Sequence, residues 1–150
     1  MTMASIDGPY VQLACFCDQI LEDKTGALSL IRIIDTIFRN ASGLTTPEEM
    51  QPFQQTLTLV LALKSGAARG RNNLTIIPEL PNGSTKDPLF FTIHFEGEER
   101  GSNIILQINF LFEYEGLYWF QVKLGEQLLT AIPLRVRYNR TMTMSGQGIG

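Results

Sequence analysis

The single histidine is the first residue to weigh as a catalyst, because imidazole serves as a general base and as a metal ligand near neutral pH. His94 lies in a segment where apolar and polar residues alternate, and this period predicts a strand with His94 pointing away from Phe91 and Phe95. A catalytic histidine needs a nucleophile and an orienting partner within reach, and the pattern supplies neither. One histidine also makes a transition-metal site weak. We therefore expect no catalytic residue and no metal site.

The two cysteines, Cys15 and Cys17, are separated by one residue in a second alternating segment. On a strand their side chains point to the same face, and Phe16 points to the other. This arrangement is poor for a disulfide between them, and two thiols are too few for a structural zinc site. We expect two buried, inert thiols on the core-facing side of the strand.

The loop at residues 66–72 combines glycines and arginines in the manner of an anion-binding loop. It lacks the Gly-Lys-Ser/Thr ending of a phosphate-binding loop, and no helix is predicted after it. It is interpreted as a flexible connection in which Arg69 or Arg71 is available to an anion. Acidic residues collect near several strand ends, but without the fixed spacing of a calcium loop. The sequence therefore predicts a protein that is not an enzyme and uses no cofactor.

The elements that carry these residues are predicted to be strands, since alternating apolar residues recur between turn clusters. The spacing favours an all-β fold, an antiparallel β-sandwich of about eight strands. The apolar run at residues 27–37 alternates less cleanly, so it is either buried on both faces or bulged. One short helical turn is expected at residues 46–49, where a threonine, a proline and two acids follow one another. The sandwich is assigned to residues 1–140 as a single domain, and residues 141–150 to a flexible C-terminal tail.

One hairpin can be predicted in detail. If Phe110 and Phe112 share the core face with Tyr118 and Phe120, opposing residue numbers must sum to an even value. A three-residue loop at residues 114–116 satisfies this condition and places a glycine at its left-handed position.

The same hairpin leaves apolar side chains on the outer face. Leu111 is predicted to lie opposite Trp119, and the following turn sets Pro133 beside Trp119, with Arg135 flanking them. Tryptophan and arginine are enriched where partners dock. These four residues form the predicted partner-binding surface, unless the segment at residues 41–53 or the tail covers them.

Composition excludes several functional classes. The 150 residues carry a net charge of −3, which argues against a general nucleic-acid binder and against an anionic membrane surface. No segment approaches the ~18 consecutive apolar residues of a membrane span. No signal peptide is apparent, so a cytoplasmic location is expected by default.

Five segments together resemble a known family: residues 10–15, 23–26, 28–35, 116–122 and 132–136. The chain is similar over residues 8–138 to a family of small uncharacterised bacterial proteins of unknown function. The resemblance implies a compact β-sandwich of bacterial cytoplasmic origin, and it carries over no catalytic residues.

Two functions from different classes follow. The first is a non-enzymatic interaction or assembly module, which presents the Trp119 surface or a strand edge to another protein or to a second copy. The alternative is a domain that binds a small ligand or ion in a pocket lined by Tyr114, Tyr118, Arg69 or Arg71.

Overall fold

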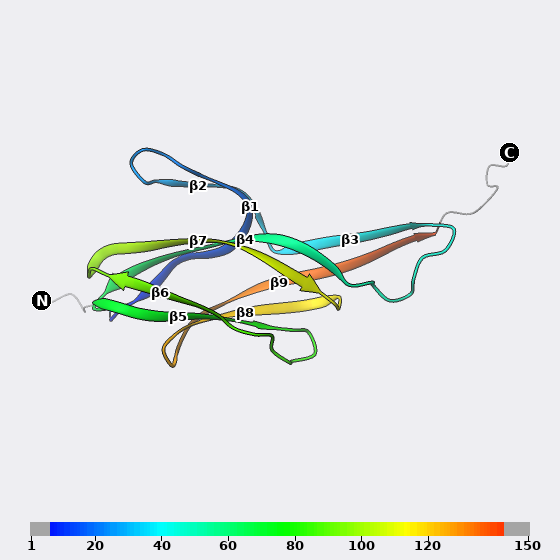
Figure 1. The fold of residues 1–150 in the computed structure, drawn as a ribbon. Helices are drawn as coiled ribbons and strands as arrows, with labels where there is room; N and C mark the ends of the chain where they lie inside the picture. Colours follow the sequence, from blue (N-terminus) through cyan, green and yellow to red (C-terminus); the bar gives the residue numbers. More distant parts are fainter. Residues whose placement is uncertain (1–6, 143–150) are drawn as a thin grey trace, which may run out of the picture.

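A computed structural model describes residues 7–142, which form nine strands and no helix (Figure 1). The strands are β1 (Tyr10–Glu22), β2 (Leu28–Ile34), β3 (Thr36–Gly43), β4 (Phe53–Gly66), β5 (Gly70–Glu79), β6 (Leu89–Phe95), β7 (Glu98–Phe112), β8 (Gly116–Leu124) and β9 (Gln127–Met142). Within the described residues, no helix long and apolar enough to cross a membrane is found.

The strands form two sheets packed face to face. One sheet has the order β2-β1-β4-β7, and the other has the order β3-β9-β8-β5-β6. All pairs are antiparallel except β3 and β9, which run parallel. The predicted all-β sandwich is therefore confirmed, with nine strands and one parallel pair.

The predicted helical turn at residues 46–49 is absent, and the segment forms bends instead. Arg140 donates hydrogen bonds to the hydroxyl and the carbonyl oxygen of Thr46, both at 3.0 Å. The Tyr138 hydroxyl donates to the carbonyl oxygen of Pro47 at 2.7 Å. The segment is thus held by contacts with β9, which take the place of a local helical hydrogen bond.

The core lies between the sheets and is rich in aromatic rings. The alternating leucines of β4 are buried, as their period predicts. Phe110 and Phe112 of β7 meet Tyr118 and Phe120 of β8 edge to face, with ring centroids 5.1–5.9 Å apart. Phe16 of β1 contacts Phe120 at 4.9 Å. The predicted sharing of one core by these two phenylalanine-bearing strands is therefore correct.

The predicted hairpin between these strands is wrong. β7 pairs with β4, with Phe112 opposite Phe53, whereas β8 lies between β5 and β9 in the other sheet. Residues 113–115 connect the two sheets. Alternation places aromatic rings in the core equally well for two paired strands and for two strands that face each other across it, so the pattern alone did not distinguish the two arrangements.

The predicted orientation of the cysteines is also wrong. The register of β1 against β4 shifts between Val11 and Leu13, and this bulge reverses the alternation. Phe16 therefore joins the core, and Cys15 is half-buried. Cys17 is buried, and both thiols are free.

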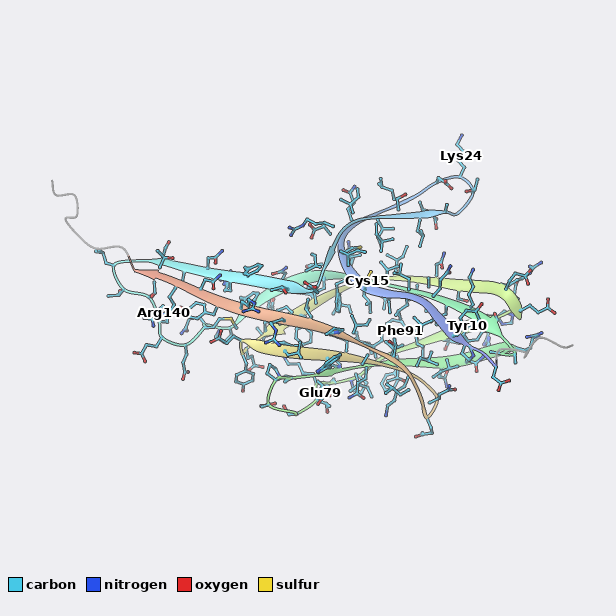
Figure 2. The ribbon with its side chains drawn as sticks, turned by 180° about the vertical axis from the view of Figure 1, so that it is seen from behind. Tyr10, Cys15, Lys24, Glu79, Phe91 and Arg140 are labelled. Atoms are coloured by element: carbon cyan, nitrogen blue, oxygen red, sulfur yellow. The ribbon has the colours of Figure 1, made fainter. Side chains whose placement is uncertain are left out.

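Beyond Cys17 the chain leaves the sandwich as a two-stranded ribbon. β1 pairs with β4 only as far as Cys17, opposite Thr58, and its later residues pair with β2 alone. We call residues 18–33 the arm; Figure 1 shows it standing away from the other strands, and Figure 2 shows Lys24 at its tip. A straight continuation from Phe16 would turn Asp18 toward the core, which is costly for a carboxylate.

The apolar run at residues 27–37 is neither buried on both faces nor a single strand. It leaves the first sheet as β2 and enters the second as β3, with Asp35 between them, and the Asp35 carbonyl oxygen accepts a hydrogen bond from the Arg135 amide at 2.9 Å. β9 extends to Met142, so the first two residues of the predicted tail belong to a strand, and residues 143–150 lie outside the described part.

Candidate partner-binding surface

Trp119 lies on the outer face of β8. Its neighbours Tyr118 and Phe120 are fully buried, and the alternation of the strand turns the indole outward, where 38% of the residue is exposed. Pro133 of β9 is directly opposite it on one side, and Glu79 of β5 is opposite on the other. The predicted placement of Pro133 beside Trp119 is thus present.

The register that aligns them depends on a bulge. Directly beside the turn the two strands pair in a register that would set Trp119 opposite Ile132. A bulge between Val122 and Lys123 shifts the pairing by one residue, so Trp119 lies opposite Pro133.

Two arginines and a phenylalanine extend this surface across β9 and β3. Arg135 lies opposite Leu117, and Arg137 lies beside Phe38 of β3. Both arginines are exposed and neither forms an ion pair with any described residue, while Phe38 is 59% exposed. The residues of this surface, the Trp119 face, are Phe38, Leu117, Trp119, Pro133, Arg135 and Arg137.

Leu111 does not belong to the Trp119 face, contrary to the prediction. It lies on β7 opposite Gln54, in the other sheet, and alternates with the core residues Phe110 and Phe112. Its side chain is therefore on the outer side of the opposite layer. The error follows directly from the hairpin that does not form.

Phe38 and Arg137 were missed by the sequence prediction. The parallel pair β3–β9 joins segments about a hundred residues apart, and neither a turn signal nor hydrophobic periodicity predicts such a pairing. The available signal was the alternation in β9, where Arg135 and Arg137 occupy the same phase as Pro133.

The long connection at residues 44–52 does not cover the Trp119 face. Its hydrogen bonds go to Tyr138 and Arg140, which alternate with Arg137 and therefore point to the opposite side of β9. Residues 41–53 therefore do not shield Trp119, contrary to the alternative considered from the sequence.

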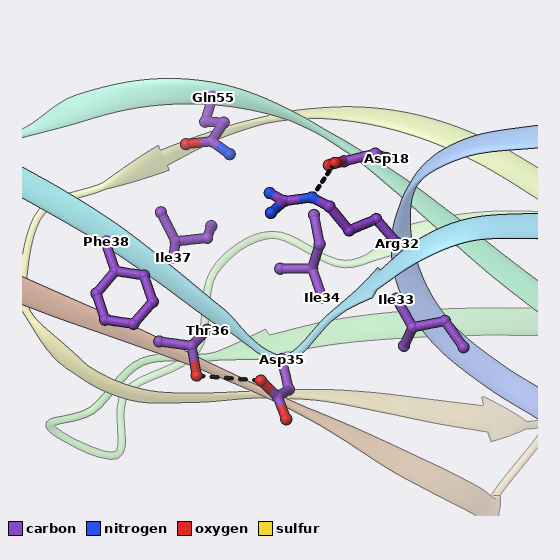
Figure 3. Close-up of a pocket in the computed structure, with 9 residues that line it drawn as sticks. All are labelled: Asp18, Arg32, Ile33, Ile34, Asp35, Thr36, Ile37, Phe38 and Gln55. Atoms are coloured by element: carbon purple, nitrogen blue, oxygen red, sulfur yellow. Dashed lines mark hydrogen bonds and ion pairs between the residues drawn. The ribbon is translucent and has the colours of Figure 1, made fainter.

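A hollow of about 440 Å³ lies where the arm leaves the sandwich (Figure 3). Its polar lining includes an ion pair between Arg32 and Asp18, and Thr36 donates a hydrogen bond to Asp35 at 3.1 Å. Arg32 has a positive φ of 58°, a conformation that is rare outside glycine and marks the bend of the arm. The rest of the lining is mainly aliphatic and aromatic: Ile33, Ile34, Ile37 and Phe38, with Gln55.

Of the two tyrosines predicted to line a ligand pocket, Tyr118 is buried in the core, whereas the exposed Tyr114 lines a hollow with Glu113, Glu115 and residues 48–52. The Tyr118 hydroxyl donates to the Tyr114 carbonyl oxygen at 2.6 Å and accepts from the Tyr114 amide at 3.1 Å. Burial raises the pKa of Tyr118 above its ordinary value. These two hydrogen bonds hold the connection from β7 to β8, and they leave the Tyr118 hydroxyl engaged with the backbone and not with a ligand.

The arginines named for the same pocket are at the other end of the molecule. Arg69 donates to the carbonyl oxygens of Gly66 and Ala68 at 2.9 and 3.1 Å. Gly66 pairs with Glu98 at one end of β4 and β7, while the crossing near Tyr114 follows the opposite end. The four residues therefore do not form one site.

The remaining reactive side chains are dispersed. His94 is exposed on β6, opposite Arg71. Burial raises the pKa of both cysteine thiols, which keeps them protonated at neutral pH. Among the described residues no group of three or more His, Cys, Asp or Glu side chains could hold a metal ion.

The fold and the surface define a β-sandwich domain with an aromatic and cationic outer face. The chain belongs to the family of unknown function DUF6941, which matches residues 12–137, so the predicted resemblance to an uncharacterised family is confirmed. No curated protein matches the chain.

Among solved structures, the chain is similar to an immunoglobulin-like protein from Pseudomonas aeruginosa. The two are 14% identical, the match covers 90% of this chain and 100% of that one, and the TM-score is 0.43. At this TM-score the similarity carries no argument about function.

Proposed function

We propose that this chain is a non-enzymatic interaction domain that binds a protein partner through the Trp119 face. One observation carries the proposal. Trp119 and Phe38 lie exposed beside Arg135 and Arg137 on strands whose opposite faces are buried, and neither arginine has an ion-pair partner among residues 7–142.

The residue types support binding. Tryptophan and arginine dominate the few positions that supply most of the free energy of protein association. Trp119 is flanked by paired strands on both sides, so its backbone is already ordered and little conformational entropy is lost on docking. Pro133 adds a rigid apolar neighbour to the same patch.

The charge of the face indicates an acidic partner. β9 carries three arginines and no acidic residue, although the whole chain has a net charge of −3. Glu79, the acid nearest to Trp119 in the register, accepts a hydrogen bond from Gln121 at 3.0 Å. A partner surface with carboxylates around an apolar recess would complement this arrangement, and such charges mainly set association rate and specificity.

The experiment is capture of a partner from a lysate of the source organism, followed by affinity measurements with the purified partner. Trp119→Ala should weaken the affinity about tenfold or more, as truncation of an interface tryptophan does. The double substitution Arg135→Glu and Arg137→Glu should weaken the affinity more at low salt than at high salt, because salt screens interactions between charges.

Phe90→Ala is the matched control, because Phe90 is an aromatic residue with 72% exposure on β6, at the far edge of the same sheet. Its affinity should equal that of the unchanged chain. Equal binding by the Trp119→Ala and Phe90→Ala chains would refute the proposal, and so would loss of the folded state in Trp119→Ala, seen by circular dichroism.

A further inference from the structure

We propose that the arm is a self-association element: the free edge of β2 in one copy pairs antiparallel with the same edge in a second copy. The β2 edge includes no residue of the Trp119 face, and the two surfaces adjoin only at the hollow that Phe38 lines with Arg32 and Ile33. It would join two chains through backbone hydrogen bonds, leaving both Trp119 faces open to a partner.

The arm lacks the support that a ribbon of its kind requires. β1 loses β4 as a neighbour after Cys17, and β2 pairs with no described strand other than β1. An isolated two-stranded ribbon is marginally stable in water, whereas three or more strands with an apolar face are stable. Pairing of two arms would give four strands in the order β1-β2-β2-β1.

Both faces of the arm carry aliphatic side chains. Successive strand residues point to opposite sides, so Leu28 and Leu30 lie on one face and Ile31 lies on the other. Ile31 and Ile33 are 43% and 61% exposed. A strand that added to β2 would therefore cover apolar surface on each side of the ribbon.

The charges of the edge select a second copy as the occupant. Arg32 is the only charged residue of β2, and it forms an ion pair with Asp18 on the adjoining strand of the same arm. Two β2 edges can therefore approach each other without net repulsion between like charges. The β7 edge differs, because Glu98, Glu99 and Arg100 place charges of the kind that prevent edge pairing.

The proposed pairing of the two β2 edges is also symmetric. Antiparallel pairing of two identical edges has two-fold symmetry, so each copy offers and receives the same contacts. Each chain has a single β2 edge, so pairing through this edge joins two chains.

The test measures the oligomeric state by sedimentation equilibrium over a range of protein concentrations. The unchanged chain should sediment as a monomer–dimer equilibrium. Ile31→Lys places a cation on the edge strand of each copy near its equivalent, so it should raise the dimer dissociation constant about tenfold or more. Trp119→Ala should leave this constant unchanged, which separates the arm from the proposed partner-binding face.

Ile105→Lys on β7 is the matched control, because Ile105 is also an isoleucine on an edge strand with 43% exposure. It should dimerise like the unchanged chain, and circular dichroism should show all three variants folded. A chain that stays monomeric at about 1 mM, at the weak limit of specific affinity, would overturn the proposal. Equal weakening by Ile31→Lys and Ile105→Lys would overturn it too, as would dimerisation unaffected by Ile31→Lys.

Discussion

The Tyr118 hydroxyl forms two hydrogen bonds in the core, since it both donates to and accepts from the backbone of Tyr114. Tyr118→Phe leaves that amide and carbonyl without this partner, and we expect a loss of about 1–3 kcal/mol in the free energy of unfolding. Urea unfolding measures it. Tyr114→Phe is the control, because the Tyr114 side chain is exposed and should change stability by less than about 0.5 kcal/mol. Equal losses in the two variants would contradict this role of Tyr118.

Tyr118 also sets a pH dependence. Burial raises the pKa of its phenol in the folded state, so the folded chain holds this proton more tightly than the unfolded chain. The stability is therefore complete below the ordinary tyrosine pKa of 10.0 and is lost as the pH rises through the raised value. Cys17 acts in the same direction from its ordinary value of 9.0. We expect the melting temperature to fall above about pH 9, and to fall less steeply in Tyr118→Phe. Parallel pH profiles for the two proteins would show that Tyr118 does not contribute.

At the scale of the element, the turn between β6 and β7 depends on Gly97. Its φ is 105°, and a Cβ added there would overlap the guanidinium of Arg69, which is bonded to the carbonyl oxygens of Gly66 and Ala68. Gly97→Ala should therefore lower the free energy of unfolding by more than the ~1–2 kcal/mol of the backbone conformation alone.

Gly83→Ala is the control for that substitution. Gly83 has a similar φ of 89°, but a Cβ there would meet no atom within 4 Å. The difference between the two losses, measured by thermal unfolding, reports the displacement of Arg69. If Gly83→Ala cost as much as Gly97→Ala, the Arg69 contact would have no energetic role.

Strand identity could be predicted from the sequence, and strand pairing only in part. The leucines of β4 and the aromatic residues of β7 and β8 have a clear period of two, and they are buried as expected. The pairing of Trp119 with Pro133 was predicted, but its register comes from the turn together with a bulge between Val122 and Lys123, and the period of the strands did not indicate that bulge.

The rest required information that a period does not contain. A bulge near Val11 reversed the faces of Phe16 and Cys17, and the crossing at residues 113–115 separated Leu111 from Trp119. The parallel pairing of β3 with β9 brought Phe38 to the Trp119 face from a distant part of the chain. Each depends on where the backbone changes direction or sheet, and the same side-chain alternation is compatible with several such paths.

At the scale of the whole molecule, the two proposed interaction surfaces belong to different sheets. The Trp119 face lies on the second sheet, and the arm extends from the first sheet and stands apart from both layers (Figures 1 and 2). We propose that the first binds an acidic partner and the second binds another copy. A dimer joined by its arms would present two Trp119 faces and bind a multivalent partner with increased avidity.

The measurement that tests the central proposal most directly uses the single tryptophan of the chain. With 5-fluorotryptophan incorporated, position 119 gives one fluorine resonance, which can be followed while the purified partner is added. We expect this resonance to shift to a bound position and to lose its solvent-isotope shift between H2O and D2O, because docking would bury Trp119, which is now 38% exposed. A partner that binds while the resonance keeps its position and its solvent-isotope shift would contradict the proposal that Trp119 lies in the interface.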